Sequence, residues 1–273
     1  MKRFTFLLII FLSLFLLASC SKSEKKNNKE QLDRLFTMKN KFSAVSSVLL
    51  QTDLMIEFDD KQEPTTYSYT SIAKMKRTPF ESFSDNTLSK VQKDKVDSES
   101  IHQFIMENDG GFDVYTQKKE NTPFIKLNYS VDEFSYDLQS YPNFVLMDDF
   151  LKLVTEDTTI VSDEATALVY REKPTTKIGA DLTIALVEKV LNRFPITNMT
   201  NDLPSLDAYK DFVVGEVEFY ISDGNELEAI EFNFEKGMVV LKRMGVNLLS
   251  LRLTFSETNN IKEINFPAEL KLR

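Results

Sequence analysis

A period of two in the apolar residues is the feature that most constrains this chain. In residues 54–58, 217–221 and 251–255, apolar side chains alternate with mostly polar ones. Successive side chains of a β-strand point to opposite faces of its sheet, so each segment predicts a strand with one buried face. The regular succession of such segments near the C-terminus is typical of an antiparallel meander with one apolar and one polar face.

Short polar turns separate these segments. Asp109-Gly110-Gly111 is the strongest hairpin signal, because glycine adopts positive φ without a Cβ penalty, and residues 59–61 and 223–225 give further turns. We expect strands near residues 53–58, 67–76, 80–83, 88–96, 101–107, 112–117, 124–129, 134–138, 167–171, 213–222, 230–234, 239–241, 249–255 and 264–266. Residues 196–210 read as a polar loop that is interrupted by Pro204.

Helical spacing of apolar residues appears in three other segments. Residues 30–51, residues 144–154 after Pro142, and residues 178–194 before Pro195 each carry one apolar stripe. We expect these helices to pack on the sheet. For the first helix, a position on a membrane surface is the alternative, which its mixed charges do not favour.

The N-terminus has the layout of a secretory signal. Basic residues at positions 2 and 3 precede an apolar run from Phe4 to Leu17, which is shorter than the roughly 20 residues that a spanning helix needs. The ending Leu17-Ala18-Ser19-Cys20 resembles the lipobox of bacterial lipoproteins. This resemblance implies cleavage before Cys20 and attachment of diacylglycerol to its sulfur. An ordinary secretory signal with an incidental cysteine is the alternative.

These features predict three parts: a signal peptide at residues 1–19, a tether at 20–29, and a single domain at 30–273. Two acyl chains on Cys20 would hold the domain on the extracytoplasmic face of the cell membrane. Whether the host has one membrane or two stays open.

Composition excludes several functions. The chain has 33 Lys and Arg residues against 42 Asp and Glu residues, a formal net charge of −9, which argues against nucleic acid as a partner. Cys20 is the one cysteine, so the chain can form no internal disulfide and offers no thiolate cluster to zinc. We expect no metal and no cofactor.

Motifs for catalysis are also missing. His102 is the one histidine, and its alternation with Phe104 and Met106 favours a partly buried, hydrogen-bonded imidazole over a general base. The adjacent acids Asp59-Asp60 and Asp148-Asp149 point to different faces, so we read the first pair as a turn and the second as a solvated helix face. Residues 108–113 lack the order and the distal Glu of a calcium loop. We therefore expect a protein that is not an enzyme.

Several stretches are similar to a known family. Residues 218–227 look like its strand–turn–strand segment, and residues 251–256 through 264–270 look like its closing strands. The lipobox, the first helix and residues 72–79 also fit. Together they resemble the LolA-like and LppX/LprG-like bacterial lipoproteins, above all the uncharacterised surface lipoproteins of Gram-positive bacteria with that fold.

The resemblance implies an α+β fold, in which a curved antiparallel half-barrel sheet carries helices on its concave face and encloses an apolar cavity for acyl chains. From the residues alone, a filled core and a cavity are equally well supported. The residues expected to line such a cavity, which could equally be plain core, are Leu54, Ile56, Phe58, Val217, Phe219, Ile221, Leu251, Leu253 and Phe255.

We therefore expect a membrane-anchored, non-enzymatic lipoprotein that binds or carries a lipid or glycolipid by its acyl chain. Burial gains about 0.8 kcal/mol per CH₂, so such binding needs no polar motif. The alternative is a module with a filled core that binds another cell-envelope protein. A hydrolase that depends on His102 or on assembled carboxylates is the third and weakest reading.

Overall fold

The computed structural model describes residues 28–60, 63–120, 122–133, 144–152, 154–170, 173–191, 194, 212–243, 245–267 and 270. The predicted signal peptide with Cys20, the predicted strand at 134–138 and the predicted loop at 196–210 lie outside the described residues. Residues 28 and 29 of the predicted tether already belong to a helix that spans residues 28–43.

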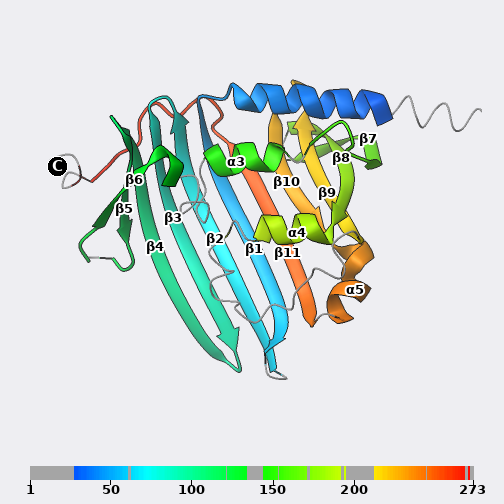
Figure 1. Cartoon of the computed structure of the whole chain (residues 1–273). Coiled ribbons are helices and arrows are strands. Elements are labelled where there is room, and N and C mark those ends of the chain that lie inside the picture. The colour runs from blue at the N-terminus through cyan, green and yellow to red at the C-terminus, as the bar shows by residue number, and fades with distance from the viewer. Residues whose placement is uncertain are drawn as a thin grey trace, which may run out of the picture.

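One antiparallel sheet of eleven strands dominates the described structure (Figure 1). Its strands are β1 (Ser47–Asp60), β2 (Glu63–Arg77), β3 (Phe80–Gln92), β4 (Lys95–Asn108), β5 (Gly111–Gln117), β6 (Ile125–Ser130), β7 (Ile160–Tyr170), β8 (Lys173–Thr183), β9 (Val213–Ser222), β10 (Leu227–Asn233) and β11 (Val246–Ser256). The order across the sheet is β6-β5-β4-β3-β2-β1-β11-β10-β9-β8-β7, so the sheet is open, with β6 and β7 at its edges.

Pairing of β1 with β11 joins two meanders into this one sheet. Strands β1 to β6 run outward in chain order on one side, and β11 back to β7 run outward on the other. The chain between β6 and β7 must therefore pass from one edge of the sheet to the other. The helix α3 (Phe144–Leu151) lies in this connection. In the same way, α4 (Ile184–Leu191) lies between β8 and β9.

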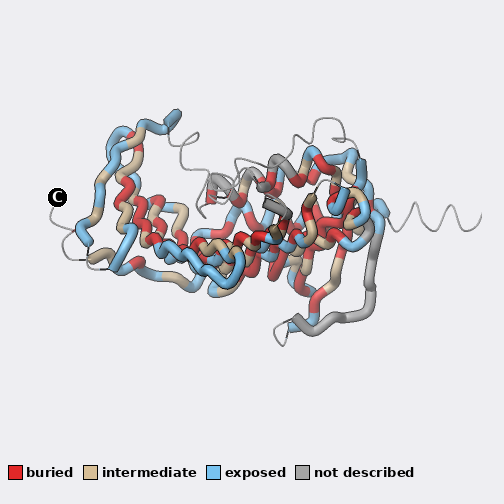
Figure 2. Tube along the Cα trace, turned by 90° about the horizontal axis from the view of Figure 1, so that it is seen from below, coloured by how far each residue is buried: buried red, intermediate tan, exposed pale blue. Residues whose placement is uncertain are grey.

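The helices pack on one face of the sheet. Figure 1 shows α3 and α4 crossing the same side of the strands, and Figure 2 shows the sheet with these helices from below. Aromatic rings of the helical segments contact each other and the sheet. The ring centroid of Phe42 lies 5.3 Å from that of Phe255 and 6.3 Å from that of Phe144, and the centroids of Phe150 and Phe232 are 6.5 Å apart. Side chains of the residue 28–43 helix, α3, α4 and ten strands share one continuous core.

Two predicted helices are shorter than expected. The first helix ends at residue 43 rather than 51, because the apolar run that follows belongs to β1, where Val48 and Leu50 are buried on alternate positions. The third begins at Ile184 rather than 178, because Ile178, Ala180 and Leu182 form the buried face of β8. The second helix, predicted over residues 144–154, is confirmed as α3, although it ends at Leu151.

Other predicted strands differ in extent. The three short strands expected between residues 80 and 107 are two long ones, β3 and β4, joined at Lys93 and Asp94, whose φ angles of 47° and 60° form the turn. Residues 239–241 belong to α5 (Met238–Arg243), after a 3₁₀ turn at Glu235–Gly237. Residues 261–267 form no strand. The hairpin at Asp109-Gly110 is confirmed, since Asn108 pairs with Gly111.

None of the helices among the described residues is long and apolar enough to cross a membrane.

Candidate functional site

The nine predicted lining residues all lie on one face of the sheet, and all of them are buried. None is more than 7% exposed. Because directly opposed residues of antiparallel strands share a face, the pairs Leu54–Leu251 and Phe255–Leu50 place the contributions of β1 and β11 together. The pairs Ile230–Leu253 and Ile230–Phe219 extend this face through β10 to β9.

A cavity of about 280 Å³ opens on this face, between the sheet and the segments that follow α3 and β8. Its apolar lining comes from the end of α3 and residues after it, from α4 and from three strands: Phe150, Val154, Ala180, Leu186, Val213, Val217, Phe219, Ile230 and Phe232. The volume lies at the lower end of the range of about 300–1,000 Å³ for small-molecule pockets. Such a lining suits an apolar ligand of modest size.

Two of the nine predicted residues line this cavity. Val217 and Phe219 do so from β9, whereas the other seven are packed into the core beside it. The sequence-based prediction missed Phe150, Val154, Leu186, Ile230 and Phe232 as lining residues. The alternation on β10 was a usable signal for Ile230 and Phe232, since their strand is the hairpin partner of β9.

Polar residues form the rest of the cavity wall. Thr155, Asp157, Thr158, Thr159, Asp181 and Thr183 complete its wall. Main-chain hydrogen bonding joins two parts of this wall, because the Asp181 N–H of β8 donates to the carbonyl oxygen of Thr159 at 3.1 Å. The Thr155 N–H donates to the hydroxyl of Thr158 at 2.8 Å. The cavity wall is thus mostly apolar, with a smaller polar part from the segment after α3 and from β8.

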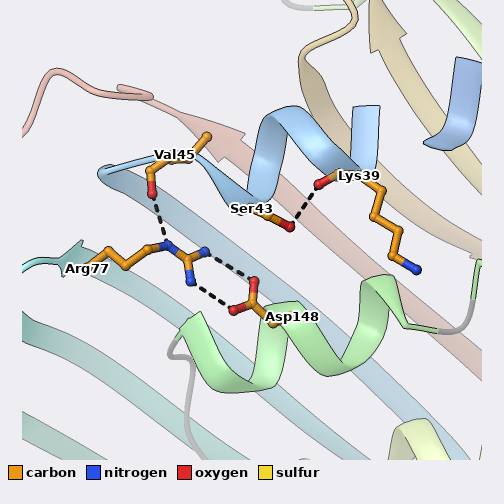
Figure 3. A network of polar contacts seen from close by, with 5 residues as sticks. All are labelled: Lys39, Ser43, Val45, Arg77 and Asp148. Atoms are coloured by element: carbon orange, nitrogen blue, oxygen red, sulfur yellow. Dashed lines mark hydrogen bonds and ion pairs between the residues drawn. The ribbon is translucent and has the colours of Figure 1, made fainter. Parts of the chain in front are cut away.

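A polar clamp holds α3 over the sheet (Figure 3). The Arg77 guanidinium at the end of β2 donates two hydrogen bonds to Asp148 of α3, at 2.8 and 3.1 Å, and a third to the carbonyl oxygen of Val45 at 3.1 Å. It also stacks 4.2 Å from the centroid of the Phe144 ring. The solvated helix face predicted for Asp148-Asp149 is therefore wrong for Asp148, which is engaged from the sheet side.

A second contact ties the far end of α3 to the first helix. The Lys39 ammonium donates to the carbonyl oxygen of Val154 at 2.9 Å. Val154 is also a lining residue, so the clamp at Asp148 and the contact at Val154 hold both ends of the segment that forms one cavity wall. Movement of this segment would open the cavity, because Phe150 and Val154 would leave the wall together.

The opposite face of β8–β11 carries charges. Glu218 is 5% exposed and accepts hydrogen bonds from Tyr220 and Asn233, both at 3.1 Å, and Lys177 lies 3.6 Å away. Arg252 pairs with Glu231 at 2.7 Å. Burial, together with the charges of Glu231 and Glu218, raises the pKa of Tyr220 above its usual value. These contacts lie on the sheet face away from the cavity, since Phe219 and Tyr220 alternate.

His102 lies in a groove on that same outer face, far from the cavity. Its Nδ1 lies 3.3 Å from a carboxylate oxygen of Asp85 on the neighbouring strand, and its side chain is 21% exposed, so the imidazole is partly buried as expected. The groove, of about 880 Å³, also takes in Phe83, Phe104 and Phe124, and the C-terminal residues Pro267 and Leu270.

The turn at residues 108–113 satisfies its own polar groups. Asn108 donates to Asp113 at 2.8 Å, and Lys126 pairs with Asp113 at 2.9 Å and has a raised pKa because of this hydrogen bond. The Asn108 amide and the Lys126 ammonium thus bind the Asp113 carboxylate, which a calcium ion would need as a ligand. Across the described residues, no three His, Cys, Asp or Glu side chains come close enough to hold a metal ion.

Comparison with known proteins adds structural neighbours only. No family model and no curated protein matches the sequence. Among solved structures, LprF from Mycobacterium bovis is similar over 88% of this chain and 98% of its own, with a TM-score of 0.46 and 12% identity. A DUF1329 family protein from Desulfovibrio piger matches over 87% and 94%, with a TM-score of 0.25 and 8% identity.

A putative outer membrane lipoprotein-sorting protein domain from Vibrio parahaemolyticus matches over 82% of this chain and 89% of its own, with a TM-score of 0.25 and 8% identity. The structural neighbours therefore include LprF and a putative lipoprotein-sorting protein domain.

Proposed function

We propose that this chain is a non-enzymatic lipoprotein that binds the acyl chain of a lipid between its sheet and its helices. The observation that carries the proposal is the cavity of about 280 Å³, with a mostly apolar wall, on the helix-covered face of an open sheet. In this proposal α3 and α4 cover the concave side of a half-barrel. The lipid on Cys20 holds the protein at the outer face of the cell membrane, where the ligand is found.

Physical chemistry supports an acyl chain as the ligand. Phe150, Phe219 and Phe232 supply large apolar surfaces, and nine of the fifteen lining residues are apolar. Each buried methylene gains about 0.8 kcal/mol, so a few methylenes in this cavity outweigh the cost of ordering them.

A variant that fills the cavity tests this proposal. Ala180 is buried on the cavity floor, so Ala180→Leu places three additional carbons in the space where the ligand would lie. Displacing two methylenes of the ligand costs about 1.6 kcal/mol, so the dissociation constant for a fluorescent long-chain fatty acid should rise roughly 15-fold. Residues 21–273, produced without the signal peptide, are the material for the titration.

Ile178→Leu is the matched control. Ile178 is fully buried on the same strand but does not line the cavity, and a volume-conserving change there usually costs less than about 1.5 kcal/mol of stability. This variant should bind the fatty acid as the wild type does. Equal binding by wild type and Ala180→Leu would show that the fatty acid does not occupy this cavity, and no binding by any of the three proteins would refute the proposal.

A further inference from the structure

A second group of inward-facing residues differs in chemistry from the rest of that face. Strands β1 to β4 carry six small polar residues there, none more than 2% exposed: Thr52, Ser71, Ser82, Ser84, Asn86 and Gln103. We refer to them as the interior polar patch. The strands β8 to β11 fill the corresponding positions with apolar residues such as Phe219, Ile230 and Leu253.

Strand register makes these residues one continuous surface. Thr52 is opposite Ser71, which is opposite Asn86, and Ser84 is opposite Gln103. Opposed residues lie about 5 Å apart, and residues two positions apart on one strand lie about 7 Å apart on the same face. Six hydrogen-bonding side chains therefore gather within a small area.

Part of the patch is already ordered by internal hydrogen bonds. The Tyr69 hydroxyl donates to Asn86 at 2.7 Å, and the Asn86 amide donates to Ser84 at 2.9 Å and to the carbonyl oxygen of Ile101 at 3.0 Å. Around this ordered centre, four side-chain oxygens are buried without a hydrogen-bond partner. They are Thr52 Oγ1, Ser71 Oγ, Ser82 Oγ and Gln103 Oε1.

Buried polar atoms without partners are costly and uncommon in folded proteins. Across the described residues, seven side-chain atoms have this property, and four of them fall in the patch. Such a concentration indicates that the patch meets hydrogen-bonding groups that are not part of the chain. The patch contains no lysine, arginine or histidine. Arg77, which lies further along β2 than Ser71, forms an ion pair with Asp148.

The patch is aligned with the acyl-chain cavity. One row of opposed residues runs Ser71, Thr52, Leu253, Ile230 and Phe219 across five strands, and its last two members line the cavity. With strands about 4.8 Å apart, Thr52 lies roughly 10 Å from Ile230. Helix α3, which carries Phe150 of the cavity wall, contacts β2, the strand of Ser71.

We propose that the interior polar patch binds the uncharged, hydroxyl-bearing headgroup of the lipid whose acyl chain occupies the cavity. This inference rests on the proposed function and adds the class of headgroup. Serine, threonine, asparagine and glutamine side chains exchange hydrogen bonds with hydroxyl and ester groups. A phosphate is disfavoured, because burying its charge requires a cation or several converging donors that the patch lacks.

Three probes with one acyl chain test the headgroup: a monoacylglycerol, the methyl ester of the same fatty acid, and the lysophosphatidate of the same chain. Wild-type protein should bind the monoacylglycerol tightest, roughly tenfold to thirtyfold tighter than the ester, as two added hydrogen bonds allow. The double variant Ser71→Ala/Ser82→Ala should bind ester and monoacylglycerol alike, with the affinity for the ester unchanged.

The control variant is Ser68→Ala, which removes a hydroxyl from the outer face of the same strand and should keep the preference. The unfolding temperature of the ligand-free double variant should equal or exceed that of the wild type, because two unpartnered hydroxyls are removed. A marked fall would show that the chain or bound water already satisfies them, which overturns the inference.

Other results separate the two proposals. If wild type binds all three probes equally, or the double variant keeps its preference, the headgroup inference fails while acyl-chain binding stands. If wild type binds none of the probes, the proposed function fails, and the headgroup inference falls with it.

Discussion

Removal of the Arg77–Asp148 clamp should loosen α3 without unfolding the sheet. The substitution Asp148→Ala deletes two charge-assisted hydrogen bonds of 2.8 and 3.1 Å. The side chains are 27% and 34% exposed, so the pair lies between exposed pairs, worth about 0.2–1 kcal/mol, and buried ones, whose breakage costs about 3–5 kcal/mol. We expect a loss of about 2 kcal/mol in the stability of the α3 attachment.

A double-mutant cycle isolates the pair from the other contacts of Arg77. Arg77→Ala also removes the bond to the Val45 carbonyl and the stacking on Phe144, so it should cost more than Asp148→Ala. The double variant then gives a coupling energy, which we expect at about 1–2 kcal/mol. Chemical denaturation of wild type, the two single variants and the double variant supplies the four free energies of unfolding.

Hydrogen exchange shows whether the loss is local. Amide protection within α3 should fall by roughly 30-fold in Asp148→Ala, as 2 kcal/mol implies, while the central strands β1 and β11 keep theirs. In the same variant, the dissociation rate of a bound fatty acid should rise, because α3 carries part of one wall of the cavity. A coupling energy below about 0.3 kcal/mol, or unchanged protection of α3, would refute the role assigned to this clamp.

Three further predictions concern the sheet, the outer face and the ligand. Gly215→Ala should lower the free energy of unfolding by about 2 kcal/mol or more in chemical denaturation, because the added Cβ would overlap the carbonyl oxygen of Asn233. Gly110 has open space around it, so Gly110→Ala should change this free energy by less than about 0.5 kcal/mol. Equal losses in the two variants would contradict this prediction. The pKa of Tyr220 is raised, so its neutral form stabilises the fold below about pH 10, and this contribution is lost as the pH rises further. The stability advantage of wild type over Tyr220→Phe should therefore shrink between about pH 8 and pH 11. A constant difference between the two proteins would count against this prediction. Shortening a fatty acid by two methylenes should weaken binding roughly 15-fold in a fluorescence-displacement titration, and an affinity independent of chain length would exclude burial of the chain.

Much of the sheet could be predicted from the sequence, because long strands with one buried face leave a clear period of two. The strands around Leu54, Phe219 and Leu253 belong to this class, and the hairpin at Asp109-Gly110 carries its own turn chemistry. The pairing of β1 with β11 could not be predicted in this way, since it joins segments about 200 residues apart with no local signal.

The errors arose where two periods coincide. Ile178, Leu182 and Leu186 are spaced by four, which satisfies a helix, yet the first two also satisfy a strand. The boundary has a signal that was not used: the hydroxyl of Thr183 accepts a hydrogen bond from the Leu186 N–H at 3.4 Å, as an N-cap residue does at the start of α4.

The cavity was harder to predict than the sheet face on which it lies. The face that carries Val217 and Phe219 follows from alternation. The walls come from Phe150 and Val154, in the connection between β6 and β7, and from Leu186 in α4 between β8 and β9. Alternation shows which side chains are buried and cannot show which of them border empty space. The interior polar patch shows a related gap, because six small polar residues on alternate positions look in sequence like the solvent face of a strand.

Native mass spectrometry with lipid extraction tests the central claim most directly. Residues 21–273 would be expressed in cells that make extracytoplasmic lipids, purified without detergent and measured intact, and then extracted into organic solvent for identification of the lipid. The account predicts a stoichiometric adduct whose extracted acyl chain carries an uncharged, hydroxyl-bearing headgroup. A clean mass for the chain alone, unchanged after incubation with phospholipids and glycolipids, would contradict acyl-chain binding and favour a module that binds another envelope protein.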